Sequence, residues 1–176
     1  LWAILHPPGY AFMTLLVKSW QTIIPVGTLA YRTNLLSAFA AAGAGVMVFG
    51  AVRNIAPTPG PPAPFRGSPV ALHPARSAAQ SNGRAGGGEV VPAILAALSL
   101  LTASDFWQHA IHTNAHIVTA LLAAASIFLL FRWRATKNDR WLYAFGVVAG
   151  LSVTHHPLLV LGFPAYAVFI LSSNDS

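Results

Sequence analysis

The segment that decides the fold is Trp107–Phe131, WQHAIHTNAHIVTALLAAASIFLLF, which is long enough to cross the hydrocarbon core of a bilayer as one helix. Its second half, from Leu121 onwards, is almost entirely hydrocarbon. Its first half is polar and contains His109, His112, Asn114 and His116. Because polar and ionisable groups are costly at membrane depth and normally face a cavity or a partner, the segment predicts a transmembrane helix with one polar end.

The composition of the chain is that of an integral membrane protein. Hydrophobic residues make up 55% and charged residues 8% of the 176 residues, and the mean hydropathy is +0.60. In a soluble domain about a quarter of the residues are charged. The absence of cysteine excludes disulfides, thiolate nucleophiles and zinc–thiolate sites. The formal net charge of +6 does not indicate nucleic-acid binding, because the basic residues gather in two short segments between apolar runs, as in cytoplasmic loops.

We expect an all-α, polytopic transmembrane helical bundle. Residues 1–53 predict an outer turn, one interfacial helix from Gly9 to Ile24 that ends before Pro25, and the first transmembrane helix. Residues 54–89 are rich in Pro, Gly and Arg and predict a flexible loop. Residues 90–176 predict further transmembrane helices of the same domain, at Val90–Ala103, Trp107–Phe131, Trp141–Val153 and Leu158–Leu171.

The N-terminal part of the chain carries two further signals. It shows neither an initiator methionine nor a signal-peptide pattern, so we expect Leu1 to be an internal residue of a longer protein. The first transmembrane helix, Thr28–Val52, begins with polar residues and then becomes rich in alanine and glycine. Such small residues let helices approach closely in lipid, so we expect this helix to pack tightly against others.

The basic segments predict the orientation of the bundle. If Arg53, with the arginines of the following loop (Arg66, Arg76 and Arg84), and the segment Arg132–Arg140 lie on the cytoplasmic side, the two crossings between them form a hairpin. Its tip, Asp105–His109, then lies on the opposite side. The other polar positions share this outer face, where we expect one water-filled chamber lined by His6, Arg32, Asn34, His155 and His156.

Asp105, His109, His112 and His116 are spaced so that a continuous helix would place all four on one face. Such a row extends over about 16 Å, so at most two adjacent members could bind one divalent metal ion. A polar cavity wall, or histidines hydrogen-bonded between helices, are the stronger interpretations. We therefore assign no metal or other cofactor.

Arg32 has two interpretations. A guanidinium grips phosphate with two hydrogen bonds and stays charged in an apolar setting, which suits a phosphate-linked lipid. Alternatively, the side chain extends to the interface without a ligand. Of His155 and His156, one is expected to face the cavity and the other to cap a helix end. Asp105 is the carboxylate that this topology places at the outer cavity, and hence a weak candidate for a general base.

Four motifs resemble, in order and spacing, those of the protein O-mannosyltransferase-like family of the GT-C superfamily of membrane glycosyltransferases. They are HPPGY (residues 6–10), YRTNLLSA (31–38), FW (106–107) and GLSVTHHP (150–157). The resemblance implies a GT-C-like bundle that forms the N-terminal fragment of an inverting enzyme. It also implies transfer of a mannose-like sugar from a polyprenyl-phosphate donor to an unidentified acceptor at the outer or lumenal face. The membrane would be a bacterial inner membrane or one of endoplasmic-reticulum type.

By matching position, the resemblance implies substrate-binding roles for His6, Pro7, Gly9, Arg32, Asn34, Trp107 and His156. Arg32 would hold the donor phosphate, and His6 and His156 would shape the sugar pocket. The catalytic carboxylate is expected before Leu1. The chain departs from the family pattern at Asn114, where relatives often carry glutamate, and at His116, where they tend to have tyrosine.

Two other functions are compatible with the sequence. A histidine-lined helix could belong to a transporter or channel that conducts protons or metal ions. The departure at Asn114 and the absence of an acidic loop from this segment would also suit a membrane scaffold without catalytic activity. Dependence on polyprenyl phosphate distinguishes the enzyme from both.

Overall fold

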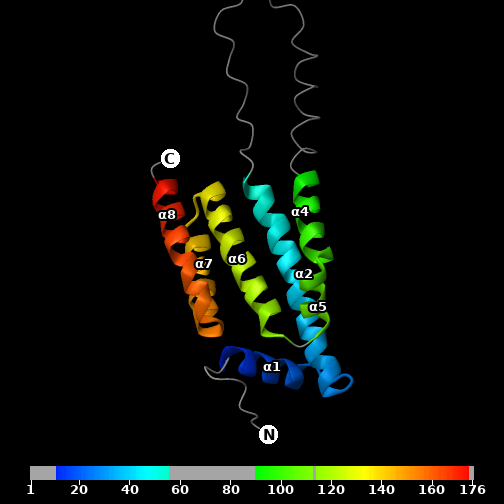
Figure 1. Ribbon diagram of the computed structural model, residues 1–176. Helices are drawn as coiled ribbons and strands as arrows, with labels where there is room; N and C mark the ends of the chain where they lie inside the picture. The colour runs from blue at the N-terminus through cyan, green and yellow to red at the C-terminus, as the bar shows by residue number, and fades with distance from the viewer. Residues whose placement is uncertain (1–10, 56–89, 113, 175–176) are drawn as a thin grey trace, which may run out of the picture.

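The computed structural model describes residues 11–55, 90–112 and 114–174, and every regular element in these ranges is helical. The expected all-α fold is therefore confirmed. The elements, labelled as in Figure 1, are α1 (Ala11–Ile23), α2 (Leu29–Ile55), α4 (Val90–Thr102), α5 (Ser104–Ile111), α6 (Ala115–Thr136), α7 (Arg140–His155), the 3-10 helix η1 (Pro157–Gly162) and α8 (Phe163–Asn174).

The long helices lie side by side, and α1 lies across one end of the bundle (Figure 1). The helix α1 ends at Ile23, shortly before Pro25, which cannot continue a helix. The chain then turns at Gly27, whose φ of 75° suits glycine. Met13 is buried against the bundle, whereas Leu15 on the other side of α1 is 64% exposed. This is the arrangement expected of an interfacial helix.

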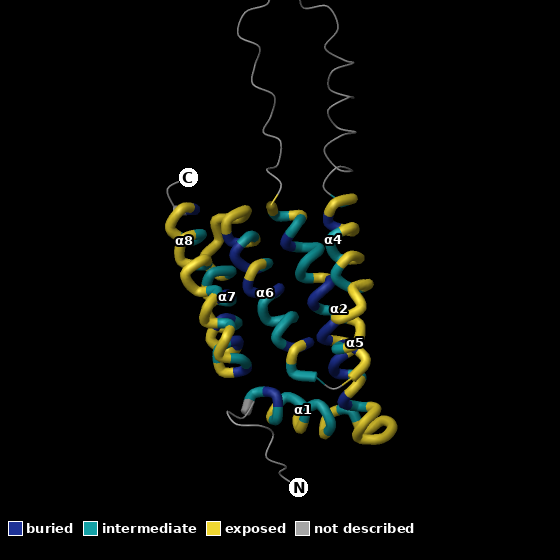
Figure 2. The backbone as a smooth tube through the Cα atoms, viewed as in Figure 1, coloured by how far each residue is buried: buried dark blue, intermediate teal, exposed yellow. Residues whose placement is uncertain are grey.

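Among the described residues, two helices, α2 and α6, are long and apolar enough to cross a membrane. The pair α4 and α5 would be a third span, bent by 63° at Ala103. Large apolar side chains on the outer sides of the bundle are exposed, among them Leu95, Val147 and Val168, as suits contact with lipid (Figure 2).

Glycines on α2 allow the close packing that the sequence predicted. An ideal Cβ atom at Gly50 would lie 2.6 Å from Cε2 of Phe128 on α6, and one at Gly45 would lie 2.9 Å from Cδ1 of Leu101 on α4. A larger residue at either position would require the side chain of Phe128 or of Leu101 to shift. The α2 helix therefore holds α4 and α6 on either side of it.

The predicted crossing Trp107–Phe131 is wrong as a single helix. The chain breaks at residues 112–114, and α5 and α6 lie on either side of the break. Asn114 adopts extended backbone and its side-chain oxygen accepts a hydrogen bond from the backbone N–H of His116 at 3.0 Å. Asparagine favours such a cap over the helix interior, which explains the break.

The break overturns two further expectations. Asp105, His109, His112 and His116 do not share one face of a continuous helix, because the first two lie on α5, the last on α6 and His112 between them. The hairpin reverses direction between the end of α5 and the start of α6 rather than at Asp105–His109 (Figure 1). A break at Pro157, by contrast, was expected: α7 ends at His155 and η1 begins at the proline.

Arg53, near the end of α2, and the basic segment Arg132–Arg140 lie at the same end of the bundle, opposite α1 (Figure 1). Arg132 Nη1 donates to Oδ1 of Asn54 at 3.4 Å, which joins the ends of α6 and α2. Lys137, in left-handed conformation at the end of α6, donates from Nζ to the carbonyl oxygen of Ser173 on α8 at 2.8 Å. Arg66, Arg76 and Arg84 lie outside the described residues.

Candidate functional site

The side chain of Arg32, at the start of α2, is hydrogen-bonded to the end of α1 and to the turn between α1 and α2. Its guanidinium donates to three carbonyl oxygens, those of Gln21 at 3.0 Å, Val26 at 3.2 Å and Gly27 at 3.0 Å. The last carbonyls of a helix have no partner within the helix, so a basic side chain at this position satisfies them. These bonds use three of the five N–H groups that a guanidinium offers.

Two side chains of α1 complete its attachment to α2. Trp20 Nε1 donates to the carbonyl oxygen of Arg32 at 2.8 Å, and Gln21 Nε2 donates to Oγ1 of Thr33 at 2.8 Å. These two residues were not predicted from the sequence to be site residues. The signal that could have found them is the presence of polar groups in an apolar, interfacial segment.

A cavity of about 520 Å³ lies between α4, α5 and α6, in the half of the bundle nearest α1. Its polar lining comes from Asp105, His109 and His116. Asp105 Oδ1 lies 3.9 Å from His109 Nε2, which is too far for a direct hydrogen bond, and its side chain is 93% exposed. The apolar lining residues are Leu100, Ala103, Phe106, Ile117 and Ala120.

Asn114 determines the hydrogen-bonding direction of His109. Its Oδ1 atom accepts from the backbone N–H of His116, so the atom 2.7 Å from His109 Nδ1 is the amide nitrogen, which can only donate. Nδ1 of His109 therefore accepts, and a neutral imidazole carries its proton on Nε2, the nitrogen that faces Asp105. From the sequence, Asn114 was expected to be a polar residue within one long helix and a departure from the family pattern, not a helix cap.

His116 stands between two other histidines. The ring centroids of His109 and His116 are 5.5 Å apart, and those of His116 and His156 are 6.0 Å apart. Within residues 11–55, 90–112 and 114–174, no group of three or more histidine and acidic side chains has the geometry to hold a metal ion. The three rings lie in a row, and those of His109 and His116 line the cavity.

The structure distinguishes the roles of His155 and His156. His155 is buried, with 1% of its surface exposed, and its Nε2 lies 3.0 Å from the carbonyl oxygen of Ala115 on α6. The ring edge of Phe12 on α1 packs against it, at a centroid distance of 5.7 Å. His156 is the C-cap residue of α7, and its ring is the one that faces His116.

Burial lowers the pKa of His155 below 6.5, and the nearby His156 and His116 lower it further, while the bond to Ala115 acts in the opposite direction. His155 is the last residue of α7, outside the two helices long enough to span a membrane. A neutral imidazole with its proton on Nε2 is therefore the form that the fold favours, because a carbonyl oxygen can only accept.

The other expected site residues are in separate places. Asn34 is exposed on α2. Trp107 is 60% exposed and lines an apolar cavity of about 270 Å³ between α2, α4 and α5, which adjoins the cavity of Asp105 at Phe106. His6, Pro7 and Gly9 lie outside the described residues. The polar side chains thus lie in the half nearest α1, but they do not line one chamber as expected. The cavity that contains Asp105 and His109 is not lined by Arg32, Asn34, Trp107, His155 or His156.

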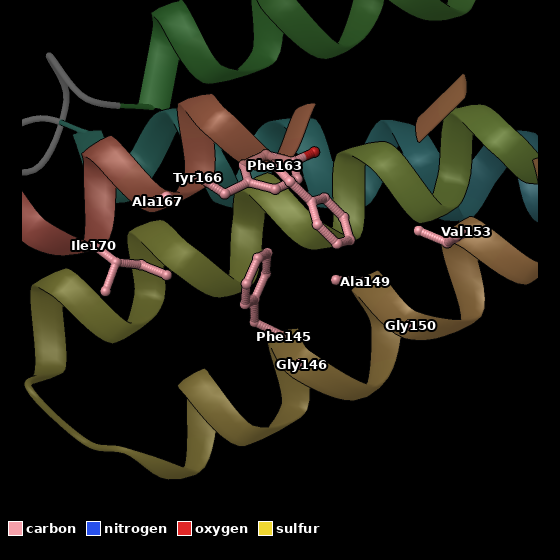
Figure 3. Close-up of a pocket in the computed structure, with 9 residues that line it drawn as sticks. All are labelled: Phe145, Gly146, Ala149, Gly150, Val153, Phe163, Tyr166, Ala167 and Ile170. Atoms are coloured by element: carbon pink, nitrogen blue, oxygen red, sulfur yellow. The ribbon is translucent and has the colours of Figure 1, made fainter. Parts of the chain in front are cut away.

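A wider groove between α7 and α8 is apolar. It has a volume of about 630 Å³, and the rings of Phe145, Phe163 and Tyr166 lie around it (Figure 3). Gly146 and Gly150 on α7 leave room in it, because nothing lies within 4 Å of an ideal Cβ atom at either position. Its chemistry suits hydrocarbon rather than catalysis.

The comparison with known families agrees with the motifs. The family model described as the protein O-mannosyl-transferase TMEM260 N-terminal domain matches residues 2–176. The chain belongs to this family. The resemblance inferred from the four motifs is therefore confirmed, and it extends over almost the whole chain.

A curated member of this family is similar over a short segment. Protein O-mannosyl-transferase TMEM260 of Mus musculus is 44% identical over 46 residues, which are 26% of this chain and 6% of the mouse protein. The chain thus aligns with only a small part of that relative. No solved structure matches the chain.

Proposed function

We propose that this chain is the membrane-embedded N-terminal part of an O-mannosyltransferase that transfers mannose from a polyprenyl-phosphate donor to an acceptor at the outer or lumenal face. The family match over residues 2–176 is the observation that carries the proposal. The name of the mouse relative supports a protein acceptor. The apolar surface of the bundle supports a donor that is itself anchored in lipid.

The distribution of charge supports the orientation. Arg53 and four basic residues of the α6–α7 region (Arg132, Arg134, Lys137 and Arg140) lie at the end opposite α1. Positively charged residues near span ends favour the cytoplasmic side. The α1 end then faces outwards or into the lumen, together with Arg32 and the neighbouring polar cavity.

In the proposed reaction, the acceptor oxygen attacks the anomeric carbon of the sugar, the bond from that carbon to the phosphate oxygen breaks, and a carboxylate takes the acceptor proton. Arg32 would hold the departing phosphate with the N–H groups that the α1–α2 turn leaves available, which favours the negative charge that develops there. His156 would border the sugar pocket, beside His116.

Two carboxylates lie within the described part of the chain, and they lie in different places. Asp139 accepts a hydrogen bond from Trp133 Nε1 at 3.3 Å, in the basic end of the bundle. Asp105 lies in the cavity near α1. Asp105 is therefore the candidate base of this chain, and a carboxylate before Leu1 is the alternative that the family resemblance implies.

The phosphate role of Arg32 needs a control for its structural role. Trp20→Phe removes one bond between α1 and α2 without removing charge, whereas Arg32→Gln removes the charge and three bonds. In the full-length protein, we expect Arg32→Gln to weaken binding of polyprenyl-phosphate mannose by about tenfold or more, because charge-assisted bonds are the strong ones. Trp20→Phe should leave it nearly unchanged. Equal losses in both variants would contradict the phosphate role.

The break at residues 112–114 bears on the transporter alternative. That alternative depended on a continuous row of histidines along one helix, and the described structure contains no such row. No observation therefore favours it over the transferase.

A further inference from the structure

The cavity between α4, α5 and α6 is lined by a carboxylate, Asp105, and an imidazole, His109, that are close together but not directly hydrogen-bonded. Asp105 Oδ1 and His109 Nε2, one turn apart on α5, are separated by 3.9 Å. Two hydrogen bonds of about 2.8 Å that meet at one oxygen atom, nearly at a right angle, span such a gap. A single hydroxyl group fits there, because it can accept from the imidazole and donate to the carboxylate.

Asn114 makes the imidazole a donor toward this position. Its amide nitrogen donates a hydrogen bond to Nδ1 of His109 at 2.7 Å. In a neutral ring, the proton is therefore on Nε2. Its oxygen is already engaged by the backbone N–H of His116 at 3.0 Å, which fixes the orientation of the amide. A donor atom and an acceptor atom therefore lie 3.9 Å apart, with no direct hydrogen bond between them.

The surroundings suit a small polar ligand. A cavity of about 520 Å³ lies within the size range of ligand pockets, which are mostly apolar with a few polar groups that fix orientation. Phe106 and Ile117 provide apolar lining, and His116 adds a further polar group. Asp105 is exposed, so a ligand can reach the pair from solvent.

We propose that Asp105 and His109 bind a substrate hydroxyl group, either of the transferred sugar or of the accepting side chain, and that Asn114 is the positioning residue that keeps the proton of His109 on Nε2. This proposal rests on the transferase function proposed above. It assigns a substrate contact to a cavity whose polar lining residues belong to none of the four family motifs. Of the lining residues, Phe106 belongs to the FW motif.

The test uses the full-length protein in lipid nanodiscs and two probes, polyprenyl-phosphate mannose and the same polyprenyl phosphate without sugar. If the hydroxyl belongs to the sugar, His109→Asn and Asp105→Asn weaken binding of the mannosylated probe by about tenfold to a hundredfold and leave binding of the plain phosphate unchanged. If it belongs to the acceptor, both probes bind as in the wild type and the acceptor KM rises by a similar factor.

His109→Gln and His112→Asn are the matched controls. A glutamine amide can place a donor near the position of Nε2, whereas the asparagine side chain is too short. His109→Gln should therefore retain much of the binding that His109→Asn loses. His112 is exposed in the same junction and does not line the cavity, so His112→Asn should behave as the wild type. Unchanged sugar binding and unchanged acceptor KM in His109→Asn, or equal losses for both probes, would overturn the proposal.

The positioning role of Asn114 has a spectroscopic readout. In protein labelled with ¹⁵N at histidine, the neutral His109 should show an unprotonated Nδ1 and a protonated Nε2, assigned by loss of the signals in His109→Gln. Asn114→Ser, which retains a capping side chain, should remove this preference. A wild-type ring protonated on Nδ1 would overturn this assignment. Absence of mannose transfer by the wild type would instead contradict the proposed function and leave this measurement meaningful.

Discussion

His155 Nε2 lies 3.0 Å from the carbonyl oxygen of Ala115, 40 residues earlier in the chain. This contact joins the end of α7 to the start of α6, directly beside the break that separates α6 from α5. The ring of Phe12 covers His155 from α1. Three helices thus meet at one buried imidazole, next to the row of rings formed by His109, His116 and His156.

The burial of His155 predicts that the fold weakens in acid. Its pKa is lower in the folded state than the ordinary value of 6.5, so the unfolded chain binds the proton more tightly. The contribution of neutral His155 is therefore complete above about pH 6.5 and is lost as the pH falls from there towards the lower, folded-state pKa. Thermal unfolding measured from pH 8 to pH 5 should show this loss in the wild type.

His155→Gln is the control for this prediction. Glutamine keeps an N–H donor for Ala115 but does not titrate. The variant should lose less stability between pH 8 and pH 5 than the wild type does. An equal loss would show that the acid sensitivity arises elsewhere in the chain.

The tight packing of α2 predicts different responses at two glycines. Gly50→Ala would place a methyl group 2.6 Å from the ring of Phe128, which is itself packed against Trp141. Overpacking of this kind costs about 1–3 kcal/mol. Gly146→Ala meets nothing within 4 Å and should change stability by less than about 1 kcal/mol. Chemical or thermal unfolding in detergent compares the two, and equal stability would contradict the packing described for α2.

The cap of α6 predicts a loss of stability at Asn114. Asn114→Ala removes the acceptor of the His116 N–H and should destabilise the start of α6 by about 1 kcal/mol. Asn114→Asp keeps a good capping group and should cost much less. Hydrogen exchange of the first amides of α6 reports the difference directly, and similar protection in both variants would argue against the cap.

The orientation of the bundle can be tested by cysteine labelling, because the chain contains no cysteine of its own. Val26 in the α1–α2 turn is 63% exposed, and Ala135 lies exposed near the end of α6. In a full-length protein without other reactive cysteines, a membrane-impermeant maleimide added outside intact cells or to the lumenal side should label Val26→Cys and not Ala135→Cys. The reverse pattern would contradict the proposed orientation.

Much of the fold could be predicted from the sequence because apolar segments of sufficient length leave few alternatives to helices. Pro25 and Pro157 correctly marked the ends of α1 and α7, since proline restricts the residue before it and cannot extend a helix. The sequence also predicted that Arg53 and the segment Arg132–Arg140 share one end of the bundle, and the contact between Arg132 and Asn54, the neighbour of Arg53, agrees with this.

The site was less accessible to sequence reasoning. The break before α6 depends on one side chain, Asn114, whose preference for a cap competes with a pattern that otherwise suits a single helix. The bonds of Arg32 depend on the course of the α1–α2 turn, which brings three carbonyl oxygens around its guanidinium. Neither arrangement follows from residue spacing, because both depend on where a turn directs the backbone.

The most direct test of the central claim is a transfer assay with the full-length protein, in which radiolabelled mannose is offered on polyprenyl phosphate or on a nucleotide, together with an acceptor protein. The account predicts transfer of mannose from the polyprenyl-phosphate donor and none from the nucleotide sugar. Transfer from the nucleotide sugar alone, or no transfer from any polyprenyl-phosphate sugar, would contradict it.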